Sequence, residues 1–366
     1  MRPKLAILGM GRVFKKMARG IHRWFAIDIV FDPNPDAAGW TELSETEPTT
    51  TATSEDEFFR LSARSDAILV LSPPAEHVRH VELAAPLHKA VFVEKPLAID
   101  FDGLRRIDRA IRANSRVYFS DFYVDVRAAL LVRAFGARPD AFDWITSKIQ
   151  DRVGMPIVNG LRDRLGPILS IQATLLEGEG EAKTVDTRPW LREPQGGGVL
   201  LDLACHHLAL YFALFGKPLE VNHAKLGFHP SGATGMAYEP WRPGGAFAET
   251  YALLNLQTST GLPVRIEVAK NWDRDSRKFQ IEGLNGSATL DFGSLNGPKN
   301  RLLTNISGQE GAVILAQNYW DFVAEGFYHY FKSGSEGTHG YSQGRAAVET
   351  IIHAKEMVKM EPEPGN

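Results

Sequence analysis

Short apolar runs alternate with amphipathic stretches along the first third of the chain. The runs lie at Leu5–Leu8, Ile27–Phe31, Ala67–Leu71, Ala90–Val93 and Arg116–Phe119, and glycine or polar residues bound each of them. Uninterrupted runs of this length are typical of strands buried on both faces, and the stretches between them suit crossover helices. The pattern therefore predicts a parallel, doubly wound sheet.

Two polar signals predict where helices of this region begin. Ser54 and Glu57 have the spacing of a capping box, which predicts a helix from there to about Ala63. Asp100 can cap a helix that continues to Asn114. The polar tract Ser44–Thr53 is interpreted as a solvated loop with room for a short edge strand in Thr49–Thr53.

The pattern changes after about residue 122. A helix is predicted at Val124–Phe135 and another from Gly198 to Gly216, and two more close the chain at Ala316–Phe331 and Ser342–Met357. Strand-like runs separated by turn signals occur at 168–175, 252–257, 264–268, 278–282 and 288–292. We therefore predict an α/β fold in two domains, 1–122 with the parallel sheet and 123–366 with a large open, mostly antiparallel sheet.

Composition narrows the class of protein. The chain has 366 residues, 44% hydrophobic and 23% charged, with a net charge of −3, which is the balance of a soluble globular protein of about two domains. The charge gives no reason to expect nucleic-acid binding, and no apolar stretch is long enough for a membrane helix. Met1–Lys4 is basic, but the apolar run after it soon meets Gly9, so we expect a strand rather than a signal peptide. The single cysteine, Cys205, excludes a disulfide framework, and a cytoplasmic location is expected.

The first candidate site is a glycine turn. Gly9-x-Gly11 follows the first strand and opens a helix, where backbone N–H groups can bind a pyrophosphate. Asp32 ends the next strand, where a carboxylate accepts both ribose hydroxyls of an adenosine and repels a 2′-phosphate. The third position of the usual glycine motif is Phe14, so the motif is incomplete by itself. We expect NAD(H) rather than NADP(H), although Arg12 in the loop could reverse that preference.

Two further segments carry candidate catalytic side chains. Glu94-Lys95-Pro96 ends a strand at the edge where ligands of open parallel sheets bind, and a lysine there can stabilise negative charge on a substrate oxygen. Asp202 and His206 follow Gly196–Gly198 and are four residues apart in an apolar helix, so they share one face. His207 points elsewhere and is more simply a structural histidine. A metal site is not expected, because adjacent helix positions diverge and no H-E-x-x-H motif is present.

Together these segments, with Ser72-Pro73-Pro74-x-x-His77 and the tryptophan of Arg188–Arg192, resemble the Gfo/Idh/MocA family of nicotinamide-dependent oxidoreductases over nearly the whole chain. The resemblance implies a Rossmann domain followed by an α/β domain whose open sheet forms oligomer contacts, in a homodimer or homotetramer. It implies Lys95 as the active-site lysine, Asp202 as its partner or a substrate anchor, and His206 as acid/base. The implied cofactor contacts are Gly9, Gly11, Arg12, Val13, Asp32, Ser72, Pro73, His77, Glu94 and Lys95. The implied substrate contacts are Lys95, Tyr123, Trp190, Asp202 and His206.

Three positions depart from the family pattern. Ala209 stands where an aspartate often follows the histidine, which removes a possible sugar-hydroxyl contact. Phe14 replaces the small residue of the glycine loop and would crowd the contact between helix and strand. Ser120–Asp125 lacks the frequent Asn/Arg-Phe pattern. A particular polyol therefore does not follow from the resemblance.

The sequence favours a dehydrogenase or reductase that moves a hydride between NAD(H) and a secondary alcohol or ketone of a sugar, cyclitol or related polyol. One alternative is a glycoside-cleaving enzyme that holds NAD and oxidises the sugar ring transiently. Another is a non-catalytic dinucleotide or sugar sensor on the same scaffold, against which the joint presence of Lys95, Asp202 and His206 argues.

Overall fold

The computed structural model describes most of the chain. The described residues are 1–43, 49–87, 90–113, 116–121, 124, 128–136, 160–178, 189–194, 196–229, 238–241, 244–273, 275–293, 300–315, 319–333 and 340–360. The chain forms two compact units, Met1–Val126 with Asn318–Arg345 and Arg127–Gln317 with Ala346–Asn366. Besides the N-terminal part predicted for the first domain, the first unit therefore includes a segment from near the end of the chain.

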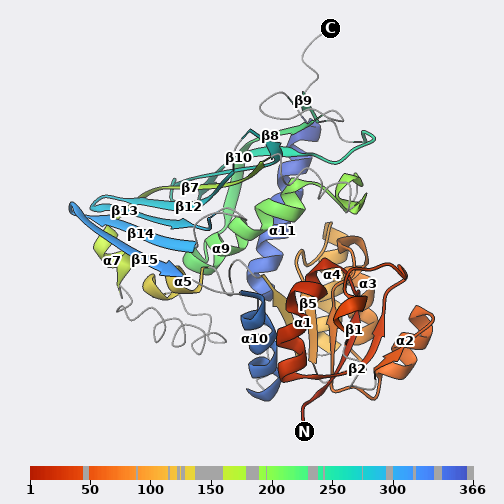
Figure 1. The fold of residues 1–366 in the computed structure, drawn as a ribbon. Helices are drawn as coiled ribbons and strands as arrows, with labels where there is room; N and C mark the ends of the chain where they lie inside the picture. The colour runs from red at the N-terminus through yellow and green to blue at the C-terminus, as the bar shows by residue number, and fades with distance from the viewer. Residues whose placement is uncertain are drawn as a thin grey trace. The chain divides into compact units, whose positions relative to one another are not determined.

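A six-stranded sheet forms the centre of the first unit (Figure 1). Its order is β3-β2-β1-β4-β5-β6, and every neighbouring pair is parallel. The strands are β1 (Lys4–Leu8), β2 (Ala26–Phe31), β3 (Thr50–Thr51), β4 (Ala67–Val70), β5 (Ala90–Glu94) and β6 (Val117–Ser120). The predicted doubly wound parallel sheet is confirmed, with β3 as the short edge strand.

Helices connect the strands of this sheet where the sequence predicts them. They are α1 (Arg12–Trp24), α2 (Glu55–Ser62), α3 (His77–Ala84) and α4 (Phe101–Ala113), with short 3₁₀ turns η1 (Trp40–Glu42) and η2 (Pro74–Glu76). The Ser54 hydroxyl accepts the Glu57 backbone N–H at 3.2 Å, and Asp100 Oδ1 accepts the Gly103 N–H at 2.7 Å. Both predicted caps are therefore present, and each satisfies a backbone donor that the first turn leaves open.

A helix from the end of the chain completes the first unit. α10 (Tyr319–Ser333) packs against α1 and the sheet, and the ring of Phe327 stacks on Phe92 at 4.6 Å between centroids. α1 approaches α10 at Gly20, where an added Cβ would lie 2.8 Å from the Cβ of Ala324. This glycine lets the two helices pack closely, which explains why residues after 318 group with the parallel sheet.

A nine-stranded sheet forms the second unit, in the order β15-β14-β13-β12-β7-β11-β10-β8-β9 (Figure 1). The strands are β7 (Ile168–Gly178), β8 (Leu219–Phe228), β9 (Glu239–Pro240), β10 (Tyr251–Thr258), β11 (Pro263–Trp272), β12 (Ser276–Gly283), β13 (Gly286–Asp291), β14 (Asn300–Ile306) and β15 (Gln309–Leu315). Only the pair β7–β11 is parallel among these described strands. The mostly antiparallel sheet is confirmed, and four of its strands (β8, β9, β14 and β15) were not predicted.

The predicted helix at 198–216 has two parts. A single π-helical turn, η7 (Leu200–Ala204), leads into α9 (Cys205–Phe215), which ends at Gly216 with a positive φ of 61°. The other helical elements of the second unit are α5 (Ala129–Ala134), α7 (Leu161–Leu165) and η6 (Pro189–Arg192), and α11 (Tyr341–Met360) runs from the first unit into it. Only the latter part of the predicted helix Val124–Phe135 lies within a described helix, α5.

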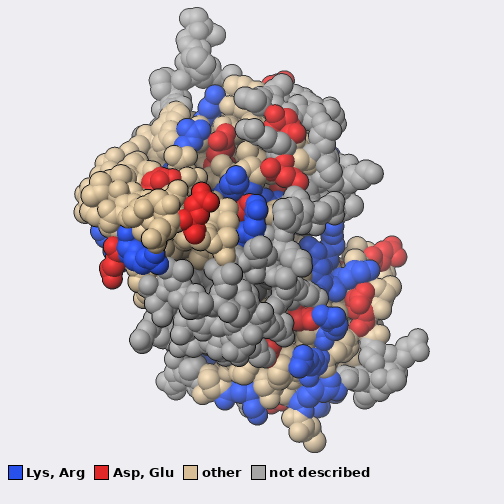
Figure 2. Space-filling model, turned by 60° about the vertical axis from the view of Figure 1, so that its left-hand side comes forward, with Lys and Arg blue, Asp and Glu red and all other residues tan. Residues whose placement is uncertain are grey.

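Charged side chains of both signs are interspersed among uncharged residues on the face drawn in Figure 2. None of the helices in the described part of the chain is both long and apolar enough to span a membrane.

Candidate functional site

The glycine turn after β1 has the conformation that a bound phosphate needs. Gly9 has a φ of +101°, and a Cβ there would lie 2.7 Å from the carbonyl of Leu71, so only glycine fits between β1 and β4. Gly11 precedes the first turn of α1, and a Cβ added to it would meet nothing within 4 Å. The N-terminus of α1 therefore has open space beside Gly11, and a helix N-terminus of this kind suits the pyrophosphate of a dinucleotide.

Asp32 is held against this turn. Its Oδ2 accepts the Met10 backbone N–H at 2.6 Å, and its Oδ1 accepts the Asn34 N–H at 2.9 Å. Each carboxylate oxygen can accept another hydrogen bond, so the ribose-binding role predicted for Asp32 remains open to it. The two backbone bonds fix the carboxylate at the end of β2.

Phe14 is accommodated without opening the turn. Its side chain is fully buried, and an added Cβ on Gly39 would lie 2.6 Å from its Cδ1. Gly39 also donates to the Met10 carbonyl at 2.6 Å, which brings the segment after β2 onto the ring. A neighbouring glycine thus makes room for the bulk of Phe14.

Two other residues predicted to contact the cofactor lie at the start of α1, where Arg12 is exposed and Val13 is half-buried.

The loop after β4 is tied to the loop after β5 through His77. Its Nε2 lies 2.7 Å from the Ser72 carbonyl oxygen and its Nδ1 2.8 Å from the Pro96 carbonyl oxygen. Burial lowers the pKa of His77 to about 4, so the ring is neutral at neutral pH. Because this value is below that of an unfolded histidine, stability falls as the pH drops from about 6.5 towards 4. His77 contacts both loops, so this buried side chain would contribute to the predicted cofactor binding by holding the two loops in place.

Lys95 lies directly after β5. Glu94 is the last residue of that strand and pairs with Ser120 of β6, and the Lys95–Pro96 peptide bond is cis. The Lys95 side chain is half-buried at the carboxyl edge of the parallel sheet. Ser72 follows β4 at the same edge, because neighbouring parallel strands end together. The sheet therefore brings the predicted residues Gly9, Asp32, Ser72 and Lys95 to one edge.

The glycine-rich segment of the second unit is anchored by Glu249. The Leu200 N–H donates to Glu249 Oε1 at 3.2 Å, and the Val199 N–H donates to the Glu249 backbone carbonyl at 3.0 Å. Lys355 Nζ lies 3.3 Å from the same carboxylate, which is fully buried. Gly198 has a φ of +94°, and a Cβ there would overlap the Glu249 carboxyl group. Glu249 and Gly198 therefore determine how the helix that carries Asp202 begins.

We expect Gly198→Ala to unfold the second unit more easily. The positive φ alone costs a non-glycine residue about 1–3 kcal/mol, and the overlap with Glu249 adds to that cost. Gly261→Ala is the matched control, because Gly261 has a φ of +84° and nothing within 4 Å of an added Cβ. Denaturant unfolding should show a larger loss of unfolding free energy for Gly198→Ala than for Gly261→Ala. Equal losses would show that the Glu249 side chain moves aside without cost.

Asp202 is paired with a lysine that the sequence did not suggest. Lys270 Nζ lies 2.9 Å from Asp202 Oδ2 and 2.6 Å from Glu177 Oε2, and all three side chains are buried. Burial lowers the pKa of Lys270, but the attraction of the two carboxylates outweighs it, so the pKa is raised and the lysine is charged at neutral pH. The structure thus gives Asp202 the partner Lys270, whereas the partnership with Lys95 implied by the family resemblance stays a prediction.

Arg277 extends this group to two cations and two carboxylates. Its Nη2 lies 3.9 Å from Glu177 Oε1, and Arg277 is 5% exposed. Buried ions cost several kcal/mol each to desolvate, and they are tolerated when each has an opposite partner. We name Glu177, Asp202, Lys270 and Arg277 the buried ion cluster. Within the described residues, no group of three or more histidine, cysteine, aspartate or glutamate side chains could hold a metal ion.

The two neighbouring histidines of α9 have different surroundings. His207 is fully buried, with its ring centroid 6.0 Å from that of Phe279 and 5.9 Å from that of Phe292. His206 is 6% exposed and is the second residue of α9, four residues after Asp202, which lies in the π-helical turn. π-helical turns are frequent at functional sites. Trp190 lies in η6, and Tyr123 is outside the described residues.

Two family models match the chain. The model of the oxidoreductase family with an NAD-binding Rossmann fold, GFO/IDH/MocA, covers residues 4–122. The GFO/IDH/MocA C-terminal domain model covers residues 162–289. Among curated proteins no sequence matches the chain.

Solved structures share the whole fold at low sequence identity. The aldose-aldose oxidoreductase from Caulobacter crescentus has a TM-score of 0.72 at 17% identity, and levoglucosan dehydrogenase, solved with NADH and levoglucosan, has 0.71 at 14%. A 3-ketoreductase from Actinomadura kijaniata, solved with NADP and TDP-benzene, has 0.68 at 15%. Each comparison covers 98% of both chains.

Proposed function

Because the chain belongs to the Gfo/Idh/MocA family of NAD-binding oxidoreductases, we propose that it moves a hydride between NAD(H) and a secondary alcohol or ketone of a sugar, cyclitol or related polyol. The observation that carries this proposal is the buried Asp202, held by Lys270, one helical turn before His206. A buried carboxylate and imidazole in an apolar helix need polar partners or a polar cavity, and such buried titratable groups cluster at functional sites. Two solved structures of the same fold, levoglucosan dehydrogenase and the aldose-aldose oxidoreductase, are named for sugars and support the substrate class.

The chain's own residues have separate tasks in this proposal. Gly9, Gly11 and the N-terminus of α1 bind the pyrophosphate, and Asp32 binds the adenosine ribose. Further contacts to the dinucleotide come from Arg12, Val13, Pro73 and Glu94.

The nicotinamide ring, when bound, supplies the hydride acceptor or donor. Lys95 donates a hydrogen bond to the reacting oxygen, and His206 takes the hydroxyl proton during oxidation. Asp202, kept in place by Lys270, anchors the substrate, with Trp190 and Tyr123 as further substrate contacts.

His206→Asn should leave folding and NADH binding intact while oxidation slows by about 10²–10⁴-fold, the usual contribution of a general base. Histidine has an ordinary pKa near 6.5, so the parent rate should fall on the acidic side, and the variant should lack that limb. Initial rates measured across pH give the test. His207→Asn is the control: the His207 ring is buried in contact with the rings of Phe279 and Phe292, so this substitution should change stability rather than the oxidation rate. The assignment would be contradicted if His206→Asn oxidised at the parent rate while His207→Asn lost activity.

NAD⁺ should be preferred over NADP⁺ by about tenfold or more in kcat/KM, because the Asp32 carboxylate would face the 2′-phosphate and like charges brought together cost several kcal/mol. Asp32→Ala should reduce the ratio of kcat/KM for NAD⁺ to that for NADP⁺. Arg12 is the residue that could reverse it, so Arg12→Ala is measured in parallel. Equal or better efficiency with NADP⁺ in the parent would show that Asp32 does not face the adenosine ribose.

Product analysis tests the reaction class. The parent is incubated with NAD⁺ and a set of sugars, sugar acids and inositols, and the product is identified by mass spectrometry and NMR. We expect one ketone formed for each NADH. A glycoside cleaved without net NADH formation would instead support the glycoside-cleaving alternative, and tight dinucleotide or sugar binding without any product would support a sensor.

The proposal includes a homodimer or homotetramer in the cytoplasm. The large sheet of the second unit has partly exposed side chains on several strands, among them Leu253 of β10. Such a face favours association between copies of the chain. The single cysteine suits a reducing compartment. Light scattering coupled to size-exclusion chromatography would give the oligomeric state.

A further inference from the structure

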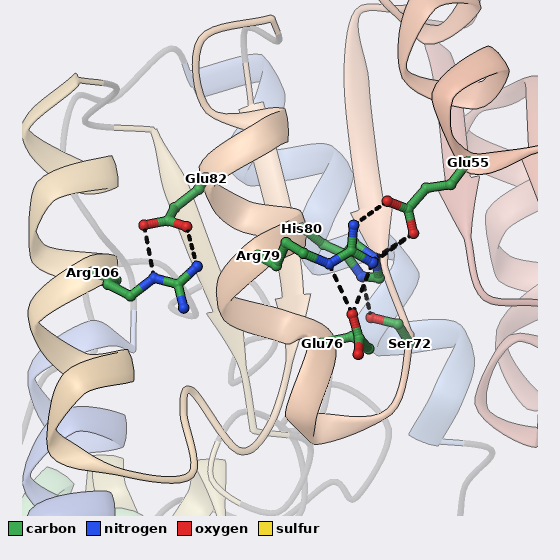
Figure 3. Close-up of polar contacts among 7 residues, drawn as sticks. All are labelled: Glu55, Ser72, Glu76, Arg79, His80, Glu82 and Arg106. Atoms are coloured by element: carbon green, nitrogen blue, oxygen red, sulfur yellow. Dashed lines mark hydrogen bonds and ion pairs between the residues drawn. The ribbon is translucent and has the colours of Figure 1, made fainter.

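A buried histidine of α3 joins the loop after β4 to a carboxylate on another helix. His80 Nδ1 lies 2.7 Å from the Ser72 hydroxyl, and His80 Nε2 lies 3.1 Å from Glu55 Oε2 (Figure 3). His80 is only 3% exposed, whereas Ser72 is half-buried at the carboxyl edge of the parallel sheet. Ser72, His80 and Glu55 therefore form a continuous hydrogen-bonded chain, which begins in the loop assigned to the cofactor.

Arg79 determines which nitrogen of His80 carries the proton. Arg79 Nη2 lies 3.0 Å from His80 Nε2, but it also donates to Glu55 Oε2 at 2.7 Å and to Glu76 Oε2 at 2.8 Å. An Nη2 group has two hydrogens, and the two shorter contacts to carboxylates use both. An unprotonated His80 Nε2 would turn its lone pair towards the Glu55 carboxylate, so the proton belongs on Nε2, which donates to Glu55. The hydrogen bond from Arg79 lowers the pKa of Glu55, so this carboxylate is an acceptor at neutral pH.

The state of His80 then determines what Ser72 can offer. Burial lowers the pKa of His80, so at neutral pH the ring is neutral, with its single proton on Nε2. Its Nδ1 is then an acceptor, and the Ser72 hydroxyl must donate to it. The proton of Ser72 is used in this bond, and only lone pairs of its oxygen remain for a ligand.

We propose that His80 and Glu55 make Ser72 a hydrogen-bond acceptor for a donor group of the dinucleotide, a ribose hydroxyl or the carboxamide N–H of nicotinamide, and not for a phosphate. A phosphate oxygen is itself an acceptor and would meet the lone pairs of Ser72. This inference rests on the proposed function, because it takes the loop after β4 to contact the dinucleotide. Ser72 is the binding residue, and His80 is a positioning residue that acts through it.

Protonation of His80 should reverse the hydrogen bond to Ser72. Its Nδ1 would then donate to the hydroxyl oxygen, so the ligand's donor would face a competing donor. The charged and titratable groups around His80 are Glu55 on α2, Glu76 on η2, and His77 and Arg79 on α3. Binding requires the neutral ring, and we expect affinity for the dinucleotide to fall as the pH falls through the pKa of His80.

Calorimetric titration with NADH tests the proposal on the parent, Ser72→Ala, His80→Phe and the double variant. Loss of one neutral hydrogen bond should weaken binding by about 2–12-fold in Ser72→Ala. His80→Phe should weaken binding similarly, and the double variant should bind no more weakly than Ser72→Ala, because His80 acts only through Ser72. The parent should lose affinity only as the pH falls below about 6.5, the ordinary histidine pKa, because burial lowers the pKa of His80, and the variants should lack that step.

Glu82→Gln is the matched control. Glu82 lies on α3 like His80, but its carboxylate pairs with Arg106 of α4 at 3.1 and 2.5 Å, apart from the Ser72 chain (Figure 3). Its NADH affinity and pH profile should equal those of the parent. His80→Gln is a second variant for the case that His80→Phe does not fold. Glutamine does not titrate, and it keeps a polar side chain at this position.

ADP-ribose distinguishes the two donor groups. It lacks the nicotinamide ring, so a penalty for Ser72→Ala with both ligands indicates a ribose hydroxyl, and a penalty with NADH alone indicates the carboxamide. A parent that binds neither NADH nor NADPH would overturn the proposed function and this inference with it. Normal NADH binding by Ser72→Ala, or a pH step that survives in Ser72→Ala and His80→Gln, would overturn this inference alone.

Discussion

Lys95→Met should reduce turnover by about 10²–10³-fold while NADH affinity stays within about twofold of the parent. Loss of one donor to a developing oxyanion has this size in other enzymes, and methionine keeps most of the side-chain volume. Lys95 lies directly after β5 at the carboxyl edge of the parallel sheet, where ligands of such folds bind. Steady-state rates and NADH titrations on the same preparations measure the two quantities separately.

Lys4→Met is the matched control for this substitution. Lys4 starts β1 at the opposite edge of the same sheet, and its exposed ammonium lies 3.3 Å from Asp28. An exposed ion pair contributes little, so this variant should keep both turnover and stability. If Lys95→Met retained most of its turnover, Lys95 would be a turn residue without a role in chemistry.

Lys270→Met should lower the free energy of unfolding by about 3–5 kcal/mol, because it removes the ammonium group that pairs with both buried carboxylates, Glu177 and Asp202. The pKa of Lys270 is raised above its unfolded value of 10.5, so its contribution is fully present below that pH and is lost as the pH rises through the folded value. The free energy of unfolding of the parent should therefore exceed that of Lys270→Met by a constant amount around neutral pH. Denaturant unfolding at several pH values measures this difference.

Lys278→Met provides the comparison for the buried ion cluster. Lys278 is exposed on β12, next to Arg277 in sequence and on the opposite side of the strand. Its replacement should change stability by less than about 0.5 kcal/mol, as surface substitutions usually do. Equal losses for Lys270→Met and Lys278→Met would show that the cluster contributes nothing to folding.

The parallel sheet was predictable because local signals agreed with the tertiary structure. Apolar runs marked β1, β2, β4, β5 and β6, and the caps at Ser54 and Asp100 form the hydrogen bonds that their spacing implies. In the second unit the missed strands β8 and β14 mix polar and apolar residues without clear alternation, since their side chains are only partly buried. Burial on both faces gives a strong sequence pattern, and burial on one face gives a weaker one.

The buried ion cluster left a readable signal that the sequence analysis missed. In β11, Val264, Ile266 and Val268 alternate inward, and Lys270 continues the same parity. Glu177 likewise continues the inward series of β7, and Arg277 begins that of β12. A charged residue at an inward position must have a partner. Which partner it has could not be predicted, because these residues meet only through the pairing of β7 with β11 and β12.

The π-helical turn at Leu200–Ala204 was also beyond the sequence. The spacing of Asp202 and His206 suggested one face of a regular α-helix, whereas the Cys205 N–H donates to the carbonyl of Leu200, five residues earlier. Two residues of this wider turn make tertiary contacts, Leu200 with Glu249 and Asp202 with Lys270. Periodicity alone does not report such contacts, so the local helix geometry required the structure.

Absorbance at 340 nm tests the central claim most directly. The parent is mixed with NAD⁺ or NADP⁺ and each member of a panel of sugars, sugar acids and inositols, and Lys95→Met is run beside it. The account predicts a steady rise with at least one member of the panel, faster with NAD⁺ and reduced about 10²-fold or more in the variant. A parent that binds NADH yet gives no rise with any member, or a rise that Lys95→Met leaves unchanged, would contradict it.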